Sequence, residues 1–283
     1  MKEQTIIHYK GNTYPSLRHI TDPSLAFYNT RRIREALHED LPLGADIVAR
    51  PMEGLTFLAW NGATLMPAKK TFDMAVAVAC ALDSVDRHVV VGDIGTGTGV
   101  FPITVASLLD GKSSYFATDI SGKALETANI NAQINGLPEG KITWKRTDCM
   151  RGLSQEAPGF DVIFSNPPFS RTADLPRVNR SRFNPDLALD GGSDGAMYYR
   201  QFALEAVPML NKGGVLIFQL PLEEEGVEQA VRTVYPLFPA LPIHLLSDTG
   251  RRYKQHFPLF MTLGGSPQFI QQLQAQHYHA ERV

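Results

Sequence analysis

The sequence predicts an α/β fold in which a mostly parallel sheet is covered by helices on both faces. Three observations lead to this fold class. From Thr71 onward, short β-branched or aromatic runs alternate with stretches of helical spacing. A glycine-rich turn, Asp93–Gly99, joins one such run to a helical stretch, as is typical of α/β proteins. The chain has 283 residues, of which 43% are hydrophobic, so it can bury a large core.

The expected elements follow one another in a regular order. The first is a helix over Thr71–Leu82, because Phe72, Ala75, Val76 and Ala79 recur at helical spacing. The other expected helices are Val100–Leu109, Gly122–Gln133, Ala196–Leu210 and Glu223–Tyr235. The expected strands are His88–Asp93, Tyr115–Asp119, Ile142–Arg146, Phe160–Ser165, Val215–Leu220 and an antiparallel pair at Ile243–Ser247 and Phe257–Leu263.

Residues 1–70 differ from this pattern and predict a small N-terminal appendage. A helical stretch is expected around Leu25–His38. Leu55–Trp60 and Ala63–Met66 flank Asn61-Gly62, a dipeptide that favours hairpin turns because both residues tolerate positive φ. The chain is therefore divided into an appendage with a β-hairpin at 1–70, a main domain at 71–265, and a C-terminal tail or helix at 266–283.

Composition excludes several classes of protein. Lys and Arg number 27 against 29 Asp and Glu, so the net charge of −2 does not favour strong binding to nucleic acid. Cys80 and Cys149 lack metal-ligand spacing, which argues against a disulfide scaffold and a cysteine-based zinc site. No apolar run approaches the ~18 residues of a membrane span, and the N-terminus has no apolar signal core. We expect no bound metal, no membrane contact and a cytoplasmic location.

The glycine-rich turn combines an acid with three glycines. Dinucleotide sites use G-x-G-x-x-G/A, but counting from Gly95 places Val100 at the third glycine position. The observed D-x-G-x-G-x-G pattern resembles motif I of class I S-adenosylmethionine (SAM) methyltransferases. SAM carries an ammonium that an acid beside the loop suits, and a helix N-terminus offers free N–H groups. The alternative is a tight structural turn. The expected cofactor contacts are Asp93, Gly95, Thr96, Gly97 and Gly99.

Two further acids follow strands. Asp119 ends the next strand, where a carboxylate accepts hydrogen bonds from a ribose diol in both NAD and SAM sites. Ile120 can pack on an adenine face or belong to the core. Asp148 follows the third strand, where methyltransferases often place an acid that accepts from the adenine amino group; the alternative is a loop acid or helix cap.

The segment Asn166-Pro167-Pro168-Phe169 is the strongest chemical signal. It follows a strand at the edge of the sheet where α/β ligands bind. The Asn166 side-chain carbonyl and the Pro167 backbone carbonyl can together accept from the two N–H groups of a planar NH₂, and Phe169 can stack on its plane. An amide nitrogen is a poor nucleophile because its lone pair is delocalised. Holding it in line with a sulfonium methyl can compensate for this low reactivity. Two acceptors also disperse the positive charge that grows on nitrogen.

These residues resemble the release-factor glutamine methyltransferase family (HemK/PrmC). The resemblance lies in N-P-P-F, in Asn184–Gly195 (NPDLALDGGSDG), in Tyr198–Arg200, and in Leu65–Thr71. It implies a Rossmann-like class I sheet of seven strands, SAM as cofactor, and methyl transfer to an amide nitrogen held by Asn166 and Pro167. It also gives Asn166 a place beside the cofactor.

Several residues depart from the family pattern. Phe169 stands where the family has Tyr, Ala68-Lys69-Lys70 stands for Arg-Pro-Glu, and Gln219 stands for an acid. Residues 1–70 do not match the family's helical bundle, which recognises the release factor. These departures leave the substrate open, and a paralogue with a different substrate is an alternative.

Local charge offers one further indication of the substrate. Asp174 is the single acid among four arginines after the N-P-P-F motif, and charged forks of this kind bind carboxylates or phosphates; the alternative is a solvated loop. The expected substrate-side residues are Pro168, Arg171, Arg177, Arg180 and Arg182. A second basic group comprises Arg251, Arg252, Lys254 and His256.

Three functions are consistent with the sequence. The first is a SAM-dependent N-methyltransferase that modifies a planar amide or amino nitrogen, in the first place a protein glutamine side chain. The second applies the same chemistry to an RNA or DNA base or to a small metabolite. The third is a nucleotide-binding protein without transferase activity, against which the intact N-P-P-F motif argues, because binding alone does not need it.

Overall fold

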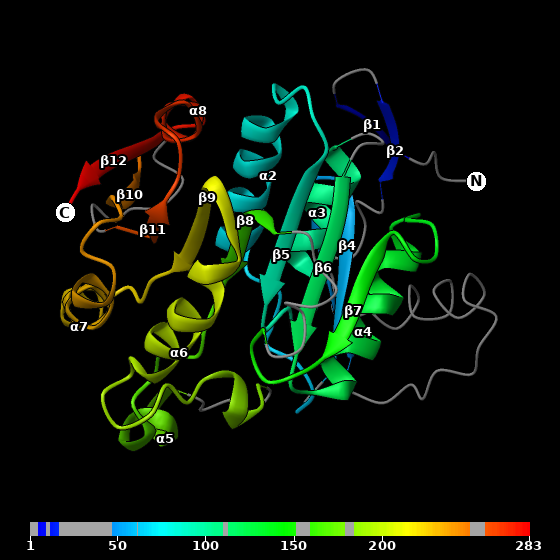
Figure 1. Ribbon diagram of the computed structural model, residues 1–283. Coiled ribbons are helices and arrows are strands. Elements are labelled where there is room, and N and C mark those ends of the chain that lie inside the picture. Colours follow the sequence, from blue (N-terminus) through cyan, green and yellow to red (C-terminus); the bar gives the residue numbers. More distant parts are fainter. Residues whose placement is uncertain are drawn as a thin grey trace.

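The structure is a computed structural model that describes residues 5–9, 12–16, 47–60, 62–109, 113–150, 159–178, 184–249 and 258–283 (Figure 1). Its main feature is a sheet of eight strands in the order β12-β10-β11-β9-β8-β5-β6-β7. The strands are β5 (Val89–Ile94), β6 (Ser113–Asp119), β7 (Ile142–Arg146), β8 (Phe160–Ser165), β9 (Leu210–Gln219), β10 (Ile243–Asp248), β11 (Phe260–Gly264) and β12 (Tyr278–Arg282).

The strands from β9 to β7 are parallel, and β11 runs antiparallel between β9 and β10. The longer helices are α2 (Lys69–Asp83), α3 (Val100–Leu108), α4 (Gly122–Ile134), α6 (Met197–Ala206), α7 (Glu224–Val234) and α8 (Pro267–Ala275). Short helical turns are α5 (Leu175–Val178), η1 (Thr172–Asp174), η2 (Asp186–Ala188), η3 (Val207–Met209) and η4 (Tyr235–Leu237). The α/β class and the alternation of elements are confirmed.

The expected count of seven strands is wrong, because the C-terminal segment adds an eighth. Within the segment predicted as a tail or helix, α8 is followed by β12, which pairs antiparallel with β10 at the edge of the sheet. Ser266 caps α8 by accepting a hydrogen bond from Phe269 N at 3.2 Å. Tyr278 is buried, and its ring meets that of Phe260 edge-on at 5.9 Å. One buried aromatic side chain thus anchors a strand whose other residues are mostly polar.

The helix expected over Ala196–Leu210 is shorter than predicted. It ends at Ala206, and η3 contains Pro208, which lacks the N–H needed to continue an α-helix. Strand β9 begins at Leu210 rather than Val215, because Leu210 pairs with Phe160 before a register shift brings Val215 opposite Val162.

The hairpin exists, but its predicted turn is wrong. Strand β4 (Leu55–Trp60) pairs antiparallel with the preceding β3 (Ile47–Met52), and Ala63–Met66 forms no strand. The turn lies at Glu53-Gly54, whose φ angles of 44° and 103° satisfy a two-residue turn that needs positive φ at both positions. A second pair, β1 (Thr5–Tyr9) and β2 (Asn12–Ser16), precedes it. The helix expected at 25–38 and residue Asn61 lie outside the described residues.

Helices cover both faces of the sheet. One hydrophobic cluster contains residues of α2, α3, α4 and α8, and a second contains residues of α6 and α7. Strand β8 serves both clusters: Val162 and Phe164 belong to the first, and Phe160 and Ile163 to the second. This explains its nearly continuous apolar sequence, as expected for a central parallel strand.

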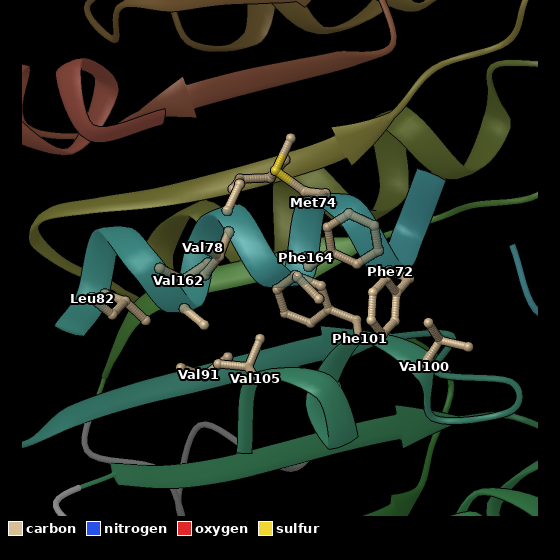
Figure 2. Packing of buried hydrophobic residues seen from close by; sticks show 14 of the residues in the cluster. Phe72, Met74, Val78, Leu82, Val91, Val100, Phe101, Val105, Val162 and Phe164 are labelled. Atoms are coloured by element: carbon tan, nitrogen blue, oxygen red, sulfur yellow. The ribbon is translucent and has the colours of Figure 1, made fainter. Parts of the chain in front are cut away.

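Within the first cluster, Phe101 of α3 stacks on Phe164 of β8 with ring centroids 4.2 Å apart, close to α2 (Figure 2). The stack joins the helix that follows the glycine loop to the strand that precedes N-P-P-F. The described part of the chain contains no helix long and apolar enough to cross a membrane. Those residues also form no group of three or more His, Cys, Asp or Glu side chains suited to a metal ion.

Candidate active site

A cavity of about 230 Å³ opens at the carboxyl ends of β5, β6 and β8. Ligands of open α/β sheets bind at this edge. The two sequence motifs meet here, since the glycine loop and Asn166 line the same cavity. Other walls come from the segment after β4, from η2 and from α6; the lining residues of these walls are Gly62, Ala63, Thr64, Leu65, Met66, Pro67, Ala68, Pro185, Leu187, Ala188, Tyr198 and Phe202.

The glycine loop lies between β5 and α3. Gly95, Thr96 and Gly97 line the cavity, as does Asp93 at the end of β5. Gly99, predicted as a cofactor contact, does not. A Cβ at Gly99 would lie 2.7 Å from Ile103 Cδ1 and 3.1 Å from Ala128 Cβ, and its φ is +77°. Gly99 therefore allows close packing of the loop against α4 rather than forming the cavity wall.

Asp119 organises the loop through both carboxylate oxygens. Its Oδ2 accepts from Gly97 N and its Oδ1 from Ser121 N, each at 2.9 Å. Each oxygen retains acceptor capacity for a further hydrogen bond. Burial raises the pKa of Asp119, and the backbone N–H donors oppose this shift. A diol that donates to this carboxylate would add to the stabilisation of its ionised form.

Asp93 is a buried acid beside the loop, 3% exposed. Burial raises its pKa to about 7, and the negative charge of Asp119 adds to the shift. Near neutral pH the two carboxylates therefore share one side of the cavity at the cost of mutual repulsion. A cation bound between the loop and Asp93 would relieve this repulsion.

A third group of residues also lines the cavity. Asp148 lines it after β7 and accepts from Gln201 Nε2 at 3.2 Å through Oδ1. Ile120 lines it with 49% of its surface exposed, and Tyr198 and Phe202 lie one turn apart on α6. This combination of apolar surface and one acid fits a flat heterocycle with an amino group.

Asn166 has an unsatisfied acceptor. Its Oδ1 is buried and has no hydrogen-bond partner among the residues that the structure describes. An orphaned carbonyl oxygen of this kind is costly unless a ligand satisfies it. Pro168 lines the cavity and Pro167 is buried. Phe169 does not line it: the ring is partly buried and packs against the second hydrophobic cluster, so its predicted stacking on an acceptor has no support in this geometry.

The glycine-rich segment 189–195 braces the N-P-P-F loop. Ser170 N donates to Leu189 O at 2.9 Å, and Gly191 N donates to Ser170 O at 2.7 Å. A Cβ at Gly191 would lie 2.8 Å from Phe169 Cα, and one at Gly195 would lie 2.6 Å from Phe169 O. Only glycine permits this close approach, which explains the need for glycine at these positions.

Replacing Gly191 by Ala is expected to shift the N-P-P-F loop and reduce turnover about tenfold, because small displacements of positioning groups are expensive. Affinity for the cofactor should change less than about twofold, since the glycine loop is untouched. Steady-state kinetics and calorimetric titration measure the two effects. Gly122→Ala is a matched control, because the nearest atom to its Cβ is 3.7 Å away. Normal turnover in Gly191→Ala would refute the bracing role.

The predicted arginines lie outside the cavity where they are described. Arg171 forms an ion pair with Glu225 of α7, and Arg177 lies 3.7 Å from Asp174. Arg180, Arg182 and the second basic group at 251–256 lie outside the described residues. The two predicted arginines that the structure describes are therefore paired with acids.

Comparison with known proteins places this chain in a family. Residues 67–181 match the model of the "Methyltransferase small domain". The release factor glutamine methyltransferase of Flavobacterium psychrophilum is 32% identical over 202 residues, which cover 68% of each chain. The chain belongs to the release factor glutamine methyltransferase family.

Other relatives in this family are more similar over shorter stretches. The proteins of Chlorobaculum tepidum and Moorella thermoacetica are 37% and 34% identical. The aligned regions cover 50% and 61% of this chain, and 48% and 60% of those proteins. The chain thus spans about half to three fifths of these two relatives.

Solved structures confirm the class I methyltransferase fold. A SAM-dependent methyltransferase from Agrobacterium tumefaciens has a TM-score of 0.51 and 17% identity, covering 80% of this chain and 72% of that chain. The structure of SMU.776 in complex with SAH has a TM-score of 0.54 and 11% identity, covering 80% of this chain and 57% of that chain.

SAM is the cofactor of this methyltransferase family, and the cavity fits its chemistry. Asp119 would hold the ribose with its remaining acceptor capacity, and Asp148 would accept from the adenine amino group beside Ile120. The glycine loop would receive the amino-acid end, with Asp93 near its ammonium. When bound, SAM supplies an electrophilic methyl group on a sulfonium.

Binding of S-adenosylhomocysteine (SAH), the demethylated product, is expected to weaken as pH falls. The raised pKa of Asp93, about 7, means that the free protein is largely protonated there at pH 6, whereas pairing with an ammonium requires the ionised form. The proton must then be released on binding. Affinity should be roughly eightfold weaker at pH 6 than at pH 7.5.

Calorimetric titration at the two pH values measures this effect. Asp93→Asn serves as the control, since it should bind SAH more weakly than wild type at pH 7.5 and lack most of the pH dependence. Equal pH dependence in wild type and Asp93→Asn would show that another group is responsible.

Several cavity residues were not predicted as site residues. Leu65 and Met66 belong to the segment that resembles the family, but nothing in the sequence indicated that they lie in the site. The backbone here is held in place because Met66 N donates to Asn184 Oδ1 at 3.0 Å. Tyr198 and Phe202 carried a usable signal, two aromatic residues four apart on a helix. This spacing is equally common in cores, so it did not distinguish a site.

Proposed function

We propose that this protein is a SAM-dependent N-methyltransferase that methylates the side-chain amide nitrogen of a glutamine in a protein. The observation that carries the proposal is the buried, unpartnered Oδ1 of Asn166 in the wall of the cofactor cavity. This oxygen can accept one N–H of an acceptor amide, and the Pro167 carbonyl is the second acceptor of the motif.

The residues of the chain act by position rather than by base catalysis. Asn166 and Pro167 would hold the amide NH₂ so that its nitrogen can accept the methyl group, which SAM would supply when bound, leaving SAH as a neutral thioether. The acceptors stabilise the positive charge that develops on nitrogen. The extra proton leaves to water after transfer, so no strong base is required in the site.

The names of the relatives support a protein substrate, and in particular a translation release factor. We assign substrate selection to the region before Thr71, whose last part, Gly62–Lys70, leads from β4 along the cavity into α2. Residues 71–265 form the catalytic domain in this proposal.

Methyl-labelled SAM and a cell extract test the substrate class. After incubation with the purified protein, the extract is separated into protein, nucleic-acid and small-molecule fractions. We expect label in the protein fraction, stable to nuclease and released as N-methylated glutamine after proteolysis. Label in nucleic acid or in small molecules would overturn the protein-glutamine assignment while leaving the N-methyltransferase chemistry intact.

A further inference from the structure

Asn131 on α4 and Asn135, the residue that caps the C-terminus of this helix, bind the backbone edge of β4. Leu58 N donates to Asn131 Oδ1 at 2.8 Å, and Asn131 Nδ2 donates to Leu58 O at 3.0 Å. One helical turn later, Asn135 forms the same pair of bonds with Thr56, both at 2.8 Å. Each side-chain amide offers one acceptor and one donor and thus satisfies a strand edge as a neighbouring strand would.

The two asparagines differ in their third hydrogen bond. Asn131 Nδ2 also donates to Thr98 O at 2.8 Å, in the glycine loop. Asn135 Nδ2 instead donates to Asn131 O at 2.8 Å, within its own helix region. Asn131 is completely buried. Of this pair, Asn131 alone contacts β4 and the glycine loop with one side chain.

Strand β4 leads directly into the part of the cavity wall formed by Gly62–Ala68, which we call the acceptor-side wall. The chain passes from Trp60 into the lining segment Gly62–Ala68, whereas no residue of β4 itself lines the cavity. Arg50 on β3 adds a bond to this wall through Pro67 O. A shift of β4 relative to α4 would therefore move the wall relative to the cofactor loop.

We propose that Asn131 is a positioning residue that couples the acceptor-side wall to the glycine loop. The assignment of the two sides to acceptor and cofactor rests on the proposed function. Because coupling between two sites is reciprocal, ligand binding at the loop stabilises β4, and an intact β4 contact strengthens ligand binding.

SAH titration by calorimetry tests the proposal with a control from the same helix. Asn131→Leu removes both amide functions at similar volume and is expected to weaken SAH binding roughly tenfold, because Thr98 O loses its buried donor. Asn135→Leu removes the bonds to Thr56 but leaves Asn131 bonded to both Leu58 and Thr98 O, so the link between β4 and the glycine loop persists and SAH affinity should remain within about twofold of wild type. Equal affinities in wild type and Asn131→Leu, or equal losses in both variants, would overturn the coupling.

Hydrogen exchange at the Thr56 amide provides a second readout. This amide does not line the cavity, and it donates its hydrogen bond to Asn135 rather than to Asn131. SAH should slow this exchange in wild type but not in Asn131→Leu; equal slowing in both would overturn the proposal. Asn131→Ser replaces Asn131→Leu if circular dichroism shows that the latter is unfolded. If wild type fails to bind SAH, the proposed function fails; if wild type binds but the variants behave alike, only the coupling fails.

Discussion

Asn166→Ala is expected to lower turnover about a thousandfold, because it removes the acceptor that orients the amide and stabilises developing charge. SAH affinity should change less than about threefold, since the loop, Asp119 and Asp148 hold the cofactor from other elements. Within the described parts of the chain, the buried Oδ1 of Asn166 has no hydrogen-bond partner whose loss would disturb the fold. Single-turnover kinetics and calorimetry on the same preparation measure the two quantities.

Asn166→Asp is the matched variant for this prediction. It retains an oxygen acceptor at the same position and should keep more turnover than Asn166→Ala. If Asn166→Ala remains within tenfold of wild type, the acceptor role is refuted. If turnover and SAH binding fall equally, Asn166 acts on the cofactor rather than on the acceptor.

Asp119→Ala is expected to weaken SAH binding by a factor of about 100 or more, because it removes a charged acceptor of the ribose hydroxyls. It also removes the carboxylate that receives Gly97 N and Ser121 N, so the glycine loop loses its organising contact. Asp119→Asn keeps one oxygen acceptor and should fall between Asp119→Ala and wild type.

Calorimetric titration measures both variants, with Asp86→Ala as an exposed control after α2. A thermal shift with SAH should follow the same order, since a bound ligand stabilises the folded state in proportion to its affinity. SAH affinity unchanged in Asp119→Ala would contradict the assignment of the ribose site to the end of β6.

The central sheet was predictable because its strands are buried on both faces and therefore carry a strong local signal. Phe160–Ser165 was predicted to the residue, and its apolar side chains pack in both clusters. The β12 strand was not predictable, because it depends on one buried Tyr278 and on pairing with a distant strand. The hairpin turn was placed wrongly because Asn61-Gly62 is the stronger local turn signal, whereas Glu53-Gly54 is chosen by the pairing of β3 with β4.

The candidate site likewise contains residues that could be predicted from the sequence and residues that could not. Asp93, Asp119, Asp148 and Asn166 were predicted and line one cavity, because each lies at or just after the carboxyl end of a parallel strand. The different places of Gly99 and Phe169 could not be inferred, because they depend on packing against α4 and the second hydrophobic cluster. The coupling through Asn131 was equally hidden, because its partners lie 33 and 73 residues away in the chain.

The most direct test of the account is to locate the transferred methyl group by mass spectrometry. Labelled protein from the SAM-treated extract is digested and fragmented, with wild type and Asn166→Ala compared. We predict one methyl group on the side-chain nitrogen of a glutamine with wild type and none with Asn166→Ala. A methyl group on oxygen, sulfur or a nucleic-acid base, or equal labelling by both proteins, would contradict the account.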